Sequence, residues 1–190
     1  TLVSTSETTS SKSKGKYACG YGIPGTYSAK FQKTGYVTKI ISGITLTNGV
    51  LTTLDVQLDI AIPFTLSGRV QDDSSGLAVP FAEILLSSEL YQFSITADAS
   101  GNFSVANIYA DNYDVISGLW GYRTKCYSQY ISSSSGNVVI ELEKGIFDDF
   151  TFDFGWAISS TANAGYWEIG EPVGTNSNGV LANPDVDVDL

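Results

Sequence analysis

Apolar and polar residues alternate through the middle of the chain, which predicts β-strands with one buried face. Seven such stretches are predicted, at residues 64–70, 79–86, 91–96, 102–108, 113–117, 123–127 and 137–142. Turn-forming Gly, Ser, Asp and Asn residues separate them. Strong helix formers never recur at helical spacing over three turns. Seven short strands with these turns predict a sandwich of two antiparallel sheets.

The strand-and-turn pattern occurs twice. Gly15-Lys16-Tyr17 is matched by Gly101-Asn102-Phe103, Tyr27 by Tyr113, and Gly35-Tyr36 by Gly121-Tyr122, in each case 86 residues apart. Residues 54–58 resemble residues 138–142 at a spacing of 84, and a small slip in one loop accounts for the difference. Four ordered matches at a nearly constant spacing indicate an internal repeat.

The repeat divides the chain into three predicted parts. Residues 63–145 form a complete second copy, and residues 1–62 form a first copy whose initial strands are missing. After the second copy, residues 146–190 change to a dense run of aromatic and acidic residues. We interpret this last part as the start of a third, truncated β module, because it is too short for an independent domain.

The first copy lacks two strands. Its residues 2–7 fall where the third strand region of the second copy lies, so nothing corresponds to residues 64–81. A sandwich without these strands exposes an apolar face and unpaired backbone edges. Either the given chain begins within a domain, which we favour because ragged boundaries are common at chain ends, or another segment donates the strands, as in donor-strand fibres. Thr1 is neither an initiator Met nor preceded by a signal peptide, which indicates a processed or excerpted chain.

Charge and composition disfavour several classes of function. The 190 residues include 20 acidic and 10 basic ones, for a formal net charge of −10, which disfavours nucleic acid as a partner and fits solubility outside a cell. No apolar run is long enough for a membrane span. Histidine is absent, which removes Ser-His-Asp, Cys-His and the usual zinc hydrolase sites. We therefore expect no enzyme and no cofactor, with calcium as the one candidate ion.

Three small groups of residues remain as candidates for chemistry. Asp185, Asp187 and Asp189 alternate, so their oxygens are candidate calcium ligands, although a solvated acidic end is the simpler interpretation. Trp120 and Tyr122 lie at a predicted turn, where they form a candidate platform for sugar rings, although most aromatic residues of such strands pack internally. Cys19 and Cys126 are either paired in an oxidising compartment or, as we favour, two buried free thiols.

The second copy resembles a known family. The resemblance is carried by Ser67-Gly68-Arg69-Val70, Gly76, Val79-Pro80-Phe81-Ala82, Thr96-Ala97-Asp98, Gly101-Asn102-Phe103, Tyr113 and Gly121-Tyr122. In this order they resemble the carboxypeptidase regulatory-like domain, a transthyretin-like, Ig-like sandwich of seven strands. Residues 25–27 and 34–38 carry the same resemblance in the first copy. Residues 148–156, with Trp167 and residues 183–185, resemble the start of a jelly-roll module.

The resemblance implies a fold and a role. The fold class is all-β, with tandem seven-stranded antiparallel sandwiches of which the first is incomplete. The implied role is a non-catalytic spacer, stalk or fibre-assembly module in a large secreted or cell-surface bacterial protein. Its partners are then other modules of the same polypeptide and, if strands are donated, other copies of itself. The competing interpretation is a carbohydrate-binding module attached to a secreted hydrolase.

Overall fold

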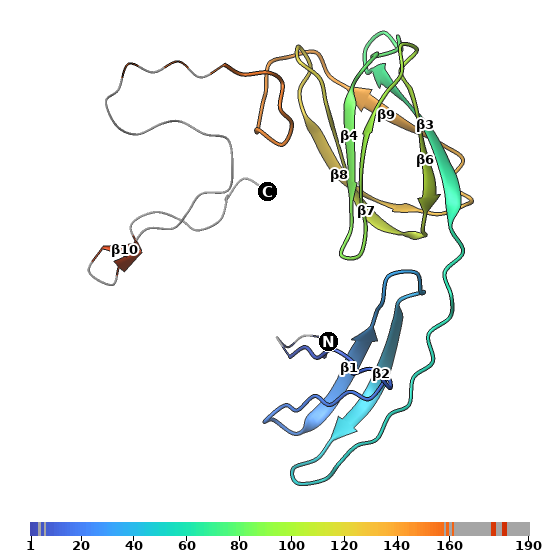
Figure 1. The fold of residues 1–190 in the computed structure, drawn as a ribbon, viewed down its shortest axis with the longest axis vertical. Coiled ribbons are helices and arrows are strands. Elements are labelled where there is room, and N and C mark those ends of the chain that lie inside the picture. Colours follow the sequence, from blue (N-terminus) through green and yellow to red (C-terminus); the bar gives the residue numbers. More distant parts are fainter. Residues whose placement is uncertain are drawn as a thin grey trace.

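The protein is built from strands and turns. A computed structural model describes residues 1–3, 5, 7–157, 159 and 161, and the backbone of residues 176–177 and 180–181. The described residues contain eleven strands and no helix (Figure 1). The predicted all-β fold is therefore confirmed. Below, residues 1–62 are called unit one and residues 63–145 unit two.

Unit two contains seven strands. They are β3 (Phe64–Asp72), β4 (Glu83–Ser87), β5 (Gln92–Thr96), β6 (Asn102–Ile108), β7 (Asp111–Gly118), β8 (Lys125–Ile131) and β9 (Asn137–Leu142). Each overlaps one predicted stretch. The second stretch begins later than predicted, at Glu83, because Pro80 lacks a backbone N–H and Phe81 has a positive φ of 60°.

The seven strands form two sheets. One sheet has the order β5-β4-β7-β8 and is antiparallel throughout. The other has the order β6-β3-β9, in which β3 is antiparallel to β6 but parallel to β9. The parallel pair departs from the predicted antiparallel arrangement. It follows from the odd number of strands: successive strands reverse direction, so the first and the seventh run the same way.

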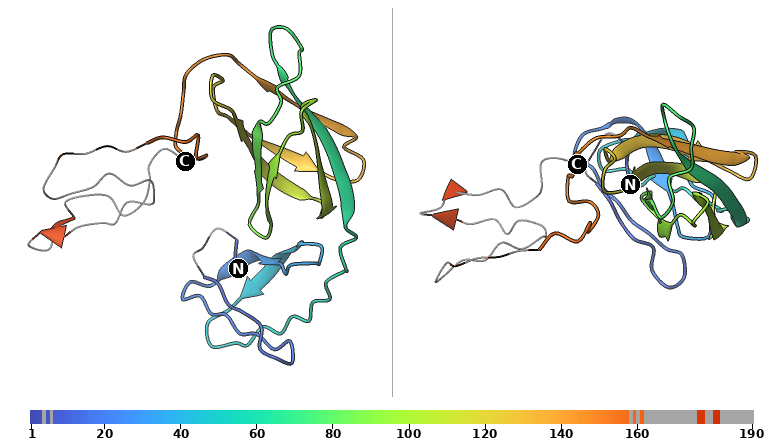
Figure 2. Two further views of the ribbon diagram at one scale, coloured as in Figure 1. Left: turned by 45° about the horizontal axis from the view of Figure 1, so that its top comes forward. Right: turned by 90° about the horizontal axis from the view of Figure 1, so that it is seen from above.

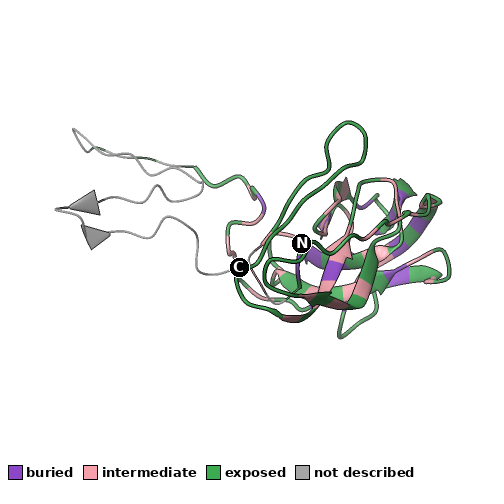
Figure 3. Ribbon diagram, turned by 90° about the horizontal axis from the view of Figure 1, so that it is seen from below, coloured by how far each residue is buried: buried purple, intermediate pink, exposed green. Residues whose placement is uncertain are grey.

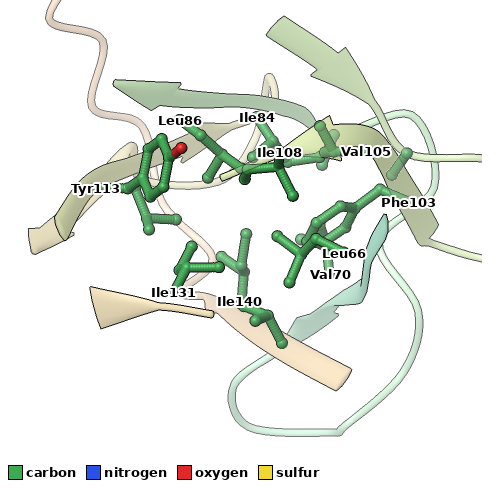
Figure 4. Packing of buried hydrophobic residues seen from close by; sticks show 14 of the residues in the cluster. Leu66, Val70, Ile84, Leu86, Phe103, Val105, Ile108, Tyr113, Ile131 and Ile140 are labelled. Carbon is green, nitrogen blue, oxygen red and sulfur yellow. The ribbon is translucent and has the colours of Figure 1, made fainter. Parts of the chain in front are cut away.

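The core of unit two lies between these sheets (Figure 4), and buried or partly buried residues alternate with exposed ones along most of their length (Figure 3). Along β9, Val138, Ile140 and Leu142 are buried, whereas the residues between them are exposed. Tyr113, at 0% exposed, is one of the largest fully buried side chains. Each fully buried aliphatic side chain contributes about 1.5–3 kcal/mol, so this core accounts for much of the stability of unit two.

Unit one is a hairpin with long extended flanks. Strands β1 (Gly25–Phe31) and β2 (Lys39–Leu46) are antiparallel, and Leu2 forms an isolated bridge with Ala29. An extended run carries the chain from this hairpin to β3 (Figure 2). Leu2 and Ala29 are the buried apolar residues described in unit one. Unit one therefore has no counterpart of the core of unit two among the described residues.

The spacings of 86 and 84 residues reappear in the hydrogen bonds of the two units. Gly15 N–H donates to Lys12 O (2.8 Å), as Gly101 N–H donates to Asp98 O (2.9 Å). Tyr36 N–H donates to Lys33 O (3.0 Å), as Tyr122 N–H donates to Leu119 O (2.8 Å). Val37 N–H donates to Asp59 O (2.8 Å), as Arg123 N–H donates to Glu143 O (2.9 Å). The hydroxyl of Tyr27 donates to Ile23 O (2.9 Å), and that of Tyr113 donates to Tyr109 O (3.0 Å). The repeat is thus structural as well as sequential.

A β-bulge explains part of the slip in spacing. Phe31 pairs with Lys39 as Ser117 pairs with Lys125, each 86 residues later. The register of β1 and β2 shifts between Tyr27 and Ala29, and Gly43 in β2 has a positive φ of 79°. One extra residue in a strand produces such a shift. The slip therefore begins within a strand and not, as the sequence predicts, in a loop.

The start of unit one differs from the prediction. Leu2 bridges Ala29 in the way that Leu86 of β4 pairs with Val115 of β7. Leu2 therefore occupies the place of the end of the second strand, not of the third strand region. Unit one then lacks a counterpart of β3 and of the beginning of β4 among its described residues.

The third part of the chain lies mostly outside the described residues. Its backbone is described in a short antiparallel pair, β10 (Asn176–Ser177) with β11 (Val180–Leu181). The predicted third module therefore stays a prediction. Within the part of the chain that the structure describes, no helix is long and apolar enough to cross a membrane.

Candidate functional site

The first and last strands of unit two lie side by side. Six consecutive residue pairs join β3 and β9, from Ser67 with Asn137 to Asp72 with Leu142. Val70 and Ile140 form one of these pairs, and both are nearly fully buried. Since the two strands are parallel, the chain enters unit two at one end of this ladder and leaves it at the other (Figure 1). Local sequence patterns do not reveal this pairing; the odd strand count signals only that the two strands run in the same direction.

A glycine in the middle of β3 permits the close packing of this sheet. A Cβ atom added to Gly68 would lie 2.1 Å from Cζ of Phe103 on β6 and 2.6 Å from the carbonyl oxygen of Val138 on β9. Both contacts are far inside van der Waals distance. The β6-β3-β9 sheet therefore requires a residue without a side chain under the Phe103 ring.

Asp72 stabilises the turn at the end of β3 through side-chain hydrogen bonds. Its Oδ1 accepts hydrogen bonds from Ser74 Oγ (2.8 Å), Ser75 N–H (2.8 Å) and Ser75 Oγ (2.6 Å). These bonds, led by that of the Ser75 hydroxyl, hold the pKa of Asp72 well below its usual range, because they stabilise the carboxylate. The Lys144 ammonium lies 3.4 Å from Oδ2. Asp72 thus closes the turn after β3 and links it to the residues that follow β9.

The structure separates the two predicted sugar-binding residues. Tyr122 packs partly buried against the core, whereas Trp120 is 54% exposed. Trp120 instead meets Trp156 edge to face, with ring centroids 5.3 Å apart. Trp156 donates from Nε1 to Oδ2 of Asp148 (2.5 Å). The candidate platform is therefore Trp120 with residues of the 146–156 run, and its ligand binding stays a prediction.

The candidate calcium ligands are three aspartates near the end of the sequence. Asp185, Asp187 and Asp189 lie outside the described residues. Among the residues that are described, no three His, Cys, Asp or Glu side chains lie close enough to hold a metal ion. The calcium site therefore stays a prediction.

Both cysteines are free and exposed, so the expectation of buried thiols is wrong. On β8 the inward positions are Tyr127, Gln129 and Ile131, and Cys126 points the other way because of the two-residue period. Partial desolvation, with Asp114 and Asp149 nearby, raises the pKa of the Cys126 thiol. A raised pKa disfavours the reactive thiolate.

Contacts between the units lie at the end of the sandwich that faces the hairpin. The Lys30 ammonium lies 2.7 and 2.6 Å from the two carboxylate oxygens of Glu89. The N–H of Gly35 donates to the hydroxyl of Tyr91 (2.9 Å), whose ring stacks on Tyr109 with centroids 4.9 Å apart. These side chains join the hairpin of unit one to the turns of unit two.

Comparison with known proteins gives a distant structural likeness. No protein-family model and no curated protein matches the chain, so the carboxypeptidase regulatory-like resemblance is not confirmed. A Streptococcal ancillary pilin is 15% identical, with a TM-score of 0.42, over 68% of this chain and 44% of its own. A variant of BcpA, the major pilin subunit of Bacillus cereus, is 12% identical, with a TM-score of 0.36, over 65% of this chain and 39% of its own. The chain thus spans less than half of either pilin.

Proposed function

We propose that the chain is a non-catalytic structural segment of a larger secreted or cell-surface protein, in which it acts as a spacer, stalk or fibre-assembly module. The parallel pairing of β3 with β9 carries this proposal. The repeated hydrogen bonds of unit one support it, because a module that occurs more than once suits an extended, repetitive structure. In the proposed assembly, another segment supplies the missing strands of unit one.

The β3–β9 pair suits a module that is held under tension. Force applied to the two ends of unit two pulls β3 and β9 past each other along their length. All the backbone hydrogen bonds of the ladder then bear the force together, whereas a hairpin pulled at its open end loses its bonds one at a time. Resistance to forced unfolding depends on the unfolding rate, and this geometry lowers that rate.

Single-molecule pulling tests the proposal. The full chain, with Cys19 and Cys126 replaced by Ser, would carry attachment points at Pro63→Cys and Ile146→Cys, so that the force shears β3 against β9. The control carries Pro63→Cys and Ser133→Cys, so that β9 is peeled from its starting end. We expect a clearly higher unfolding force in the first geometry. Equal forces would end the proposal of a tension-bearing module.

A carbohydrate-binding module is the second candidate. The exposed pair Trp120 and Trp156 favours it, because aromatic rings that are partly open to water suit the apolar faces of sugars. Titration with a panel of polysaccharides would then change the Trp fluorescence of the chain, and Trp120→Ala would remove the response. No response across a glycan array rejects this candidate.

Calcium binding at Asp185, Asp187 and Asp189 is a smaller proposal. An ion that binds only the folded state raises the melting temperature. We expect such a rise on adding calcium and its loss in the triple Asp→Asn variant. A melting temperature that is the same in calcium and in chelator would remove the proposal.

A further inference from the structure

We infer that unit one has an open slot for one β-strand between residues 17–21 and residues 54–58, and that the slot takes an extended segment with the sequence pattern of β3. This inference rests on the proposed function, in which another segment supplies the missing strands of unit one. It goes beyond that function by naming the position, the direction and the chemistry of the incoming strand.

Unit two provides the template for the slot. By the repeat spacings, residues 17–21 correspond to residues 103–107 of β6, and residues 54–58 correspond to residues 138–142 of β9. In unit two β3 lies between β6 and β9 and pairs with both. In unit one no described strand lies between the corresponding segments. The template therefore predicts a strand antiparallel to residues 17–21 and parallel to residues 54–58.

The backbone on both sides of the slot is open. Among the described residues, neither 17–22 nor 51–58 makes a backbone–backbone hydrogen bond, although the flanking turns do. The carbonyl oxygens of Leu54 and Gln57 accept side-chain bonds, from the Tyr17 hydroxyl and the Lys39 ammonium. An extended segment without backbone partners is nevertheless an edge that can pair with another strand.

The apolar residues of this segment have the alternation of β9. Leu54, Val56 and Leu58 are partly buried, whereas Asp55 and Gln57 between them are exposed. The corresponding residues of β9, Val138, Ile140 and Leu142, are buried. The segment thus already presents its apolar face inward, and an added strand would complete that burial.

The position of Tyr17 indicates which type of residue the incoming strand needs at its centre. Tyr17 corresponds to Phe103, whose ring covers Gly68 of β3. In unit one the Tyr17 hydroxyl donates to the carbonyl oxygen of Leu54 at 2.5 Å, and Leu54 corresponds to Val138 on the other side of Gly68. The Tyr17 side chain therefore crosses the slot at the place of that glycine. An incoming strand fits beneath it only with glycine there, flanked two residues away on each side by apolar residues such as Leu66 and Val70.

A graft tests the slot in the full chain. Leu2 corresponds to Leu86, so a second copy of residues 63–84 placed before Thr1 puts a β3-like strand at the correct distance. Hydrogen exchange followed by mass spectrometry would report on residues 15–22 and 51–60. We expect exchange in both segments to slow by about tenfold or more, because local opening then requires breaking a sheet. Unchanged exchange overturns the inference.

The matched control is the same graft with Gly68→Val in the grafted copy alone. Its Cβ would meet the Tyr17 ring, so the slowing of exchange should be lost. Unchanged exchange of β6 to β9 in the same measurement verifies that unit two stays folded in both chains. Equal slowing with valine and glycine overturns the requirement for the β3 pattern.

Free peptides test whether a β3-like strand or an acidic strand fills the slot. A peptide of residues 63–73, added to the ungrafted chain, should slow exchange in the same two segments. A peptide of residues 183–190, whose valines alternate with aspartates, should not; slowing by this peptide alone would assign the slot to an acidic strand and overturn the inference. The pulling comparison involves unit two alone, so failure of the slot and failure of the proposed function give different results.

Discussion

Unit one and unit two share their local structure and differ in their cores. The same turn, hairpin and tyrosine hydrogen bonds occur in both. Yet sixteen buried residues form one cluster in unit two, whereas Leu2 and Ala29 are the buried apolar residues described in unit one. Short-range sequence is thus enough to set turns and a hairpin. Dense burial additionally requires the first strand, because β3 lies between β6 and β9.

Matched truncations in the last strand give the largest difference between the units. Leu142→Ala in unit two removes a fully buried side chain and should lower the free energy of unfolding by about 3 kcal/mol. Leu58→Ala, the corresponding change in unit one, removes a partly buried one and should cost less than about 1 kcal/mol. Native-state hydrogen exchange measures both. Equal losses would mean that unit one has a core like that of unit two.

The next largest effect concerns Asp72, which has no counterpart in unit one. Its pKa is lowered in the folded state, so its stabilising contribution is complete above the ordinary value near 3.8 and is lost as the pH falls below it. Asp72→Asn should therefore destabilise unit two at pH 7, and the difference from wild type should shrink below pH 4. Urea unfolding followed by Trp fluorescence measures this, with the exposed Asp73→Asn as control. A difference that is constant with pH contradicts it.

Tyr113 and Tyr27 allow the two units to be compared at a single matching hydrogen bond. Tyr113→Phe leaves a carbonyl without its partner beside a fully buried ring and should cost about 1 kcal/mol. Tyr27→Phe removes the same bond in a more exposed setting, where water replaces it, and should cost a few tenths of that. Hydrogen exchange of β7 and β1 reports the two values. A larger loss for Tyr27 would contradict the burial argument.

The smallest effect is at the contact between the units. Glu89 is 63% exposed, and Lys30 holds its pKa below the usual value. Exposed ion pairs contribute about 1 kcal/mol or less. A double-mutant cycle of Lys30→Met and Glu89→Gln, measured on the exchange of β1, should give a coupling of this size that fades at high salt. A coupling energy that persists in high salt would show that the contact between the units is stronger than an exposed ion pair.

The sequence was sufficient for elements whose causes are local. Alternation located all seven strands of unit two, and the spacing of Gly15 and Gly101 located the repeat. The parallel pairing of β3 with β9 was not predicted, since strands about 70 residues apart in sequence leave no local pattern of their pairing. The beginning of β4 was also misplaced, because the alternation of residues 79–86 hid the turn at Pro80 and Phe81.

The candidate site was predicted less well, for a geometric reason. Trp120 and Tyr122 are two residues apart, and this spacing predicts one shared platform. The turn at Gly121, with a φ of 91°, instead lets Tyr122 face the core while Trp120 meets Trp156. The exposure of Cys126 was missed similarly, because composition gives the usual burial of cysteine but not the face of the strand that it occupies.

The parity of the strand count in unit two has a consequence for longer assemblies. With seven alternating strands, the polypeptide goes in at one pole of the sandwich and comes out at the opposite pole, so each added copy advances the chain by the height of a domain. Six or eight strands would return it to the pole where it started and fold the array back on itself. A single additional strand would therefore decide whether such repeats extend or double over.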